Sequence, residues 1–115
     1  MKARLIRYDK GYDEDGNVIA VKMWEVKTTT DKPHGYKYSL VYIVQGKRAI
    51  GYDNAEGKGD HRHYGDGTEP YKFEGLEKLA EDFYSDIEIC RKIYREVGSP
   101  LLHIRNHLQQ VLLRH

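Results

Sequence analysis

The chain has 115 residues, of which 39% are hydrophobic and 32% are charged, and its formal net charge at pH 7 is +1. This length supports one domain with a single hydrophobic core. No apolar run approaches the roughly 20 residues of a membrane-spanning helix, and no apolar stretch of the signal-peptide kind follows the N-terminal residues. Ten tyrosines and alternating apolar runs argue against disorder. We therefore expect a soluble, cytoplasmic domain without membrane contact.

The small net charge hides an uneven distribution along the chain. Residues 1–50 contain ten Lys and Arg against six Asp and Glu, whereas residues 51–70 contain two against five. A basic N-terminal half is compatible with contact to phosphates. The acidic central segment repels phosphates unless its carboxylates bind a metal, orient a histidine or meet a basic partner.

Four segments in the first half of the chain have the pattern of β-strands, at residues 3–9, 18–27, 36–44 and 48–54. Turn residues 13–17 join the first two, and Gln45-Gly46-Lys47 joins the last two. A short fifth strand at residues 61–64 is expected to return along the fourth. Short connections of this kind predict an antiparallel meander of four to five strands.

Helical periodicity follows the strands. Apolar residues recur at helical spacing from Leu76 to Val97, and the single Cys90 falls on this stripe, which assigns it to the core. Gly98 and Ser99-Pro100 separate this helix from a second amphipathic helix. We therefore predict an α+β fold, with residues 1–97 as a single domain and residues 98–115 as a helical extension that could pair two copies into a homodimer.

The segment Gly51 to Gly67 holds five of the eleven glycines, three aspartates and a His-Arg-His triplet. Glycine allows a left-handed backbone and close approach, so this density predicts a tightly shaped loop. In an extended segment His61 and His63 point to one face, while Asp60 and Arg62 point to the other.

Three functions fit these residues. Acid/base cleavage of a phosphodiester would use His61 and His63 as base and acid, with Arg62 or Lys58 on the phosphate. A metal site would instead use His61 and His63 with Asp53 or Asp60. The third is contact with RNA or protein without chemistry.

Several runs in the sequence resemble the TumE family, the toxins of prokaryotic type II toxin-antitoxin systems. They are Pro33-His34-Gly35-Tyr36-Lys37-Tyr38, then Gly51-Tyr52-Asp53-Asn54, then Gly57-Lys58-Gly59-Asp60-His61-Arg62-His63, followed by Pro70-Tyr71, Phe73, Leu79 and Asp82-Phe83. The similarity covers roughly residues 2–90. It implies a toxin role and a cognate antitoxin, which in this family is usually a helix-turn-helix protein.

Together, the residues and the resemblance predict a toxin that acts on RNA or translation. The preferred chemistry is metal-independent cleavage of a phosphodiester, and no cofactor is expected. RNA carries its own nucleophile in the 2′-hydroxyl, and Asp60 is expected to point away from the two imidazoles. A metal-dependent nuclease and a non-enzymatic binding protein remain alternatives. The candidate catalytic residues are Lys58, Asp60, His61, Arg62 and His63, and the candidate substrate-binding residues are His34, Lys37, Tyr52, Asn54 and Tyr64.

The tyrosines of the third strand allow two interpretations. Alternate tyrosines on a strand usually belong to a core, but Tyr36 and Tyr38 could also stack on bases while Lys37 between them meets a phosphate. His34 is either a turn residue between Pro33 and Gly35 or part of the site. The sequence does not decide between these readings.

Overall fold

The computed structural model describes residues 3–55 and 57–97. It contains six strands and one helix: β1 (Arg4–Tyr12), β2 (Val18–Glu25), β3 (Tyr36–Val44), β4 (Lys47–Asp53), β5 (His61–Tyr64), β6 (Gly67–Pro70) and α1 (Leu76–Val97). The expected extension at residues 98–115 lies outside the described residues. In the part of the chain that is described, no helix is long and apolar enough to cross a membrane.

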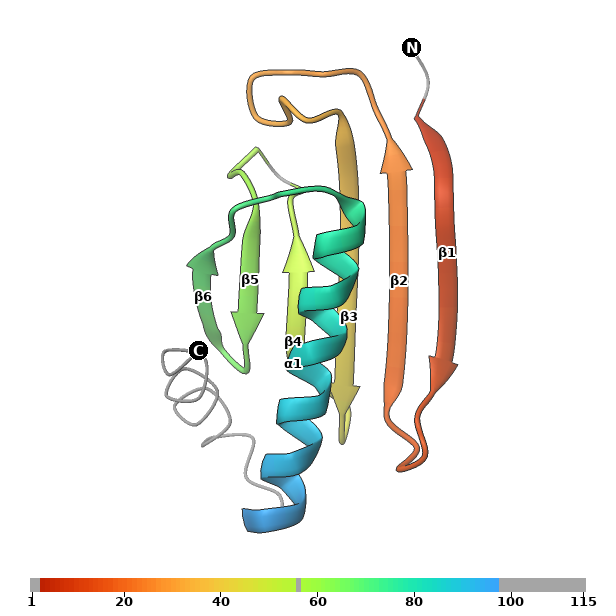
Figure 1. Ribbon diagram of the computed structural model, residues 1–115, viewed down its shortest axis with the longest axis vertical. Helices are drawn as coiled ribbons and strands as arrows, with labels where there is room; N and C mark the ends of the chain where they lie inside the picture. The colour runs from red at the N-terminus through yellow and green to blue at the C-terminus, as the bar shows by residue number, and fades with distance from the viewer. Residues whose placement is uncertain (1–2, 56, 98–115) are drawn as a thin grey trace.

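The six strands form one antiparallel sheet whose spatial order follows the chain from β1 to β6, and α1 crosses one side of it (Figure 1). This confirms the α+β meander with a covering helix. The sheet has one strand more than the four or five expected. β6 was missed because its four residues begin with glycine and end with proline, which are typical of turns.

The core lies between α1 and the sheet because one face of each is apolar. Alternate residues of β3 are buried, at Tyr38, Leu40, Tyr42 and Val44. They share the core with residues spaced three or four apart on α1: Leu79, Phe83, Ile87, Cys90 and Ile93. The burial of Tyr38 and Tyr42 supports the core interpretation of the strand tyrosines, and Cys90 is a core residue as expected.

Aromatic residues position the chain before the helix. The Tyr71 ring lies edge-on to Tyr52 at 4.9 Å, and its hydroxyl donates a 2.6 Å hydrogen bond to Asp82 of α1. Phe73 stacks on Tyr38 at 5.8 Å. α1 lies over the side of the sheet that carries Tyr38 and Tyr52, which we call the covered face. No helix of residues 3–55 and 57–97 lies over the opposite side. We call it the open face.

Candidate active site on the open face

The two imidazoles of the glycine-rich segment lie together on the open face. In the ladder between β4 and β5, His61 pairs with Asp53 and His63 pairs with Gly51. Both histidines border a pocket of about 390 Å³, whose lining is Ser39, Arg48, Asp53, Ala55, Lys58, His61 and His63. Three of the five candidate catalytic residues, Lys58, His61 and His63, are therefore brought to one pocket.

His63 is held from both sides. Its Nε2 lies 2.9 Å from Asp53 Oδ2, and its Nδ1 lies 3.0 Å from the hydroxyl oxygen of Thr68. A carboxylate only accepts hydrogen bonds, so in the neutral imidazole Nε2 carries the hydrogen and Nδ1 accepts from Thr68. This arrangement leaves Nδ1 as the atom that can take a proton.

The surroundings of His63 favour its neutral form. Burial lowers its pKa below the ordinary 6.5, and the positive charge of Arg48 lowers it further, while Asp53 acts in the opposite direction. A neutral imidazole near pH 7 is able to act as a general base.

Arg48 reaches the open face through a β-bulge. Ile50 pairs with Tyr42, but Arg48 pairs with Ile43, so the regular pairing shifts at Ala49. Ile50 lies on the covered face, so strict alternation would place Arg48 on the covered face as well. Ala49 is the extra residue of the bulge, and it turns the Arg48 side chain to the open face. Its guanidinium instead lies at the pocket, with Nη1 3.9 Å from Asp53 Oδ2.

Gly51 makes room for two of these side chains. A Cβ atom at this position would lie 2.8 Å from Cδ of Arg48 and 3.3 Å from Cδ2 of His63. Its backbone is extended, so glycine is needed for space and not for a left-handed conformation. Glycine within a strand often marks such a close approach.

Arg62 does not join the pocket. It pairs with Tyr52 on the covered face, where its guanidinium binds Glu69 and lies 5.0 Å from the ring centre of Tyr64. Alternation along β5 turns Arg62 through the sheet, as expected, so it does not reach the two histidines and cannot hold a phosphate beside them. Arg48 instead brings a guanidinium to the pocket.

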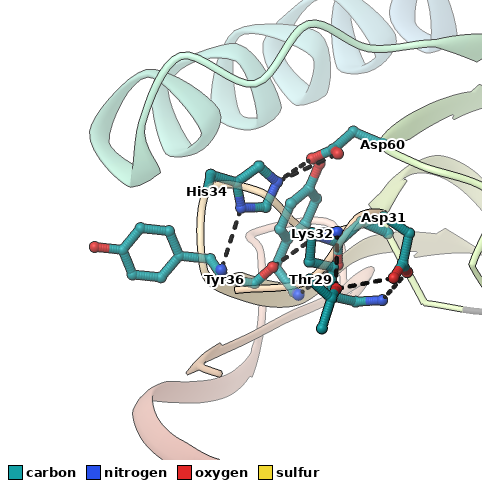
Figure 2. A network of polar contacts seen from close by, with 8 residues as sticks. Thr29, Asp31, Lys32, His34, Tyr36 and Asp60 are labelled. Atoms are coloured by element: carbon teal, nitrogen blue, oxygen red, sulfur yellow. Dashed lines mark hydrogen bonds and ion pairs between the residues drawn. The ribbon is translucent and has the colours of Figure 1, made fainter. Parts of the chain in front are cut away.

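Asp60 belongs to a separate cluster. Its carboxylate lies 3.0 Å from Nε2 of His34 (Figure 2). It also accepts a 2.6 Å hydrogen bond from the Tyr38 hydroxyl. The Nδ1 atom of His34 accepts the backbone N–H of Tyr36, so Nε2 carries the hydrogen that meets Asp60. Phe73 covers the imidazole at 3.9 Å. Asp60 therefore points away from His61 and His63, and with His34 it ties the connection before β3 to the start of β5.

Three of the candidate substrate-binding residues are part of the core. Tyr52 and Tyr64 are at most 1% exposed, and the Tyr52 hydroxyl donates to the buried Asp86 of α1. Asn54 is fully buried; its side chain accepts from the Tyr38 N–H and donates to the Tyr36 carbonyl. These side chains do not reach the pocket, and we assign them to the packing of the fold.

Lys37 lies on the open face, but Tyr36 and Tyr38, which the sequence suggested as its neighbours in a base-stacking site, do not. Tyr36 and Tyr38 take the other side of β3, and the Lys37 ammonium lies 5.6 Å from the ring centre of Trp24. Lys22 lies on the same face, paired with Ser39 of the pocket. A basic and aromatic strip thus extends from the pocket across β3 and β2.

Sequence reasoning did not include Arg48, Ser39 and Thr68 among the site residues, and it considered Asp53 only as a metal ligand. Thr68 follows from the unexpected β6, and Arg48 follows from the bulge. Asp53 could have been found, since Asp53 and His63 lie on opposite sides of a glycine-rich hairpin loop. Within residues 3–55 and 57–97, no three His, Cys, Asp or Glu side chains are grouped as a metal-binding set.

Comparison with curated proteins and with solved structures found no match. The sequence model of the family described as Toxin TumE matches residues 2–91. The match includes all six strands, the pocket and most of α1. The chain therefore belongs to the TumE toxin family.

Proposed function

We propose that this toxin cleaves RNA by metal-independent acid/base catalysis in the open-face pocket. The observation that carries the proposal is the Asp53–His63 pair, which leaves Nδ1 of the neutral imidazole as the atom that takes a proton, at a pocket that a second imidazole and two cations also line. A toxin of this kind would act in the cytoplasm, with a helix-turn-helix antitoxin as its partner.

His63 acts as the general base in this proposal. The substrate's 2′-hydroxyl takes the place of the Thr68 hydroxyl and gives its proton to Nδ1 while its oxygen attacks the adjacent phosphorus. Asp53 holds the ring through Nε2 and stabilises the imidazolium that forms. The lowered pKa of His63 keeps the base unprotonated before the reaction.

His61 acts as the general acid. It lies two residues from His63 on the same face of β5, and alternate residues of a strand are about 7 Å apart. This spacing lets two imidazoles approach one phosphodiester from two sides. As the bond from phosphorus to the 5′-oxygen breaks, His61 protonates the leaving oxygen, and the products are a 2′,3′-cyclic phosphate and a 5′-hydroxyl.

Arg48 and Lys58 bind the phosphate. Both border the pocket, and neither side chain is buried, so their charges are accessible to a ligand. Positive charge at the non-bridging oxygens stabilises the transition state. The strip of Lys22, Trp24 and Lys37 would bind the neighbouring nucleotides by stacking and by phosphate contact.

The test uses His61→Ala and His63→Gln, because glutamine keeps a hydrogen-bonding side chain but cannot take a proton at neutral pH. Loss of a general acid or base lowers the rate by about 10²- to 10⁴-fold. We expect both variants to lose RNA cleavage and growth arrest. Lys72→Ala is the matched surface control, since its side chain is 88% exposed and away from the pocket.

The melting temperature of each variant must be measured as well, because the His63 side chain is only 12% exposed and its replacement can also lower stability. If both histidine variants stay folded and keep full toxicity, the pocket is not the active site. A wild-type protein that binds RNA and arrests growth without cutting it would make this toxin a binding protein.

A further inference from the structure

Exposed apolar side chains gather along one edge of the sheet. Within the described part of the chain, the large hydrophobic residues that are exposed are Leu5, Ile6, Tyr8 and Tyr12 of β1 and Tyr84 of α1. Tyr84 belongs to the same region, because its hydroxyl lies 3.2 Å from a guanidinium nitrogen of Arg7. Leu5, Tyr8 and Tyr12 lie on the open face, because they pair with Trp24, Lys22 and Val18, whereas Ile6 and Tyr84 border the covered side. Apolar side chains that flank one strand edge on both faces mark a contact surface.

A groove continues this surface toward the helix. It has a volume of about 660 Å³ and lies between β1 and the first half of α1; among its lining residues are Ile6, Met23, Leu76, Ala80 and Tyr84. The surface therefore combines a strand edge with an apolar depression.

Among the strands that the structure describes, none pairs with the outer edge of β1. β1 pairs with β2 on one side and is the last strand of the sheet on the other (Figure 1). The opposite edge is β6, which has only four residues and contains Pro70, so it pairs poorly with another strand. β1 has nine residues and no proline. An unpaired edge of this length is a template for strand addition, and the charges that β1 carries at Arg7 and Asp9 decide which strand it accepts.

We infer that β1 pairs antiparallel with β1 of a second copy of this chain, so that two sheets join across a two-fold axis. Such an axis lies perpendicular to the sheet, so a side chain on the open face of one copy stays on the open face of the joined sheet. At the centre of the interface, one residue therefore pairs with the same residue of the second copy.

The charges select the register. Centring the axis on Tyr8 places the two Tyr8 rings together and sets Arg7 opposite Asp9 of the second copy, on the part of β1 that follows its bulge between Leu5 and Arg7. Centring on Asp9 or Lys10 sets identical charges opposite each other, which is unfavourable. Arg7 and Asp9 already form an ion pair within one chain, so the Tyr8-centred register gathers four alternating charges.

Light scattering coupled to size-exclusion chromatography tests this inference, with the wild-type chain at concentrations from 1 to 100 µM, where we expect twice the mass of one chain. Asp9→Arg should raise the dissociation constant at least tenfold, because it sets two positive side chains opposite each other across the interface. The double variant R7D/D9R restores opposite charges and should restore the dimer. K72D is a charge-reversal control away from β1.

Amide hydrogen exchange gives a second measurement. Pairing should slow the exchange of the β1 amides that point away from β2, and Asp9→Arg should make their exchange fast again. A wild-type chain that stays monomeric over this range overturns the inference. So does an Asp9→Arg variant that stays folded and dimeric, because its interface must then lie elsewhere. None of these outcomes depends on RNA cleavage, so the inference stands or fails separately from the proposed function.

Discussion

Replacing Gly51 by alanine tests whether the pocket depends on the close approach of Arg48 and His63. The added Cβ would lie 2.8 Å from Cδ of Arg48, whereas non-bonded carbons are ordinarily about 3.5 to 4.0 Å apart. Cδ must therefore move by about 0.7 Å or more. The Arg48 side chain is 41% exposed and flexible, so it can swing toward solvent at little cost to the fold.

The expected result is a loss of activity without a loss of stability. Alanine in an extended strand is favoured over glycine by roughly 0.5 to 1 kcal/mol, which offsets the adjustment of the neighbouring side chains. The free energy of unfolding should therefore change by less than about 1 kcal/mol. A misplacement of about 1 Å in a binding group can cost about 10²-fold, so we expect kcat/KM for RNA cleavage to fall by about 10- to 100-fold.

The assay compares RNA cleavage and urea unfolding of Gly51→Ala with those of Gly11→Ala, a matched control. Gly11 is also in a strand, and a Cβ there would meet nothing within 4 Å. The pKa of His63, followed by NMR, should rise in Gly51→Ala because the Arg48 charge withdraws. Cleavage at the wild-type rate, or equal losses of activity in both variants, would refute the reasoning.

Three further predictions concern charge and burial. Arg48→Gln should raise the pKa of His63, seen by NMR titration, and shift the acidic limb of the cleavage profile to higher pH. Asp86 is buried, which raises its pKa from 3.8 to about 6. The folded state therefore binds the Asp86 proton more tightly than the unfolded state does. The stabilisation of the fold that results, about 3 kcal/mol, is fully present below about pH 3.8 and is lost as pH rises through 6. Urea unfolding from pH 4 to 8 should show this decline, and Asp86→Asn should flatten it. Asn54→Ala leaves the Tyr38 N–H and the Tyr36 carbonyl without their partner and should lower the unfolding free energy by about 1 to 3 kcal/mol.

Periodicity in the sequence was sufficient to predict the architecture and to predict which residues of β5 share a face. Alternation placed His61 and His63 on one face and turned Asp60 and Arg62 to the other, as the structure has them. The stripe from Leu79 through Cys90 predicted the buried face of α1. These features depend on residues close in sequence, which is why a local pattern contains them.

The rest of the site depends on pairing between strands, which a single sequence does not determine. Arg48 faces the pocket because the ladder shifts at Ala49, and nothing in the local pattern marks that bulge. Thr68 reaches His63 only because β6 folds back along β5. His34 and Asp60 meet although 26 positions separate them.

Cleavage of RNA by metal-stripped protein in EDTA, measured from pH 5 to 9, tests the central claim most directly. The account predicts that cleavage persists in EDTA and follows a bell-shaped pH profile, with one limb that shifts when Arg48 is replaced. It also predicts products that end in a 2′,3′-cyclic phosphate. Activity that is lost in EDTA and returns only with Mn²⁺, Zn²⁺ or Mg²⁺ would contradict the account and make His61 and His63 metal ligands.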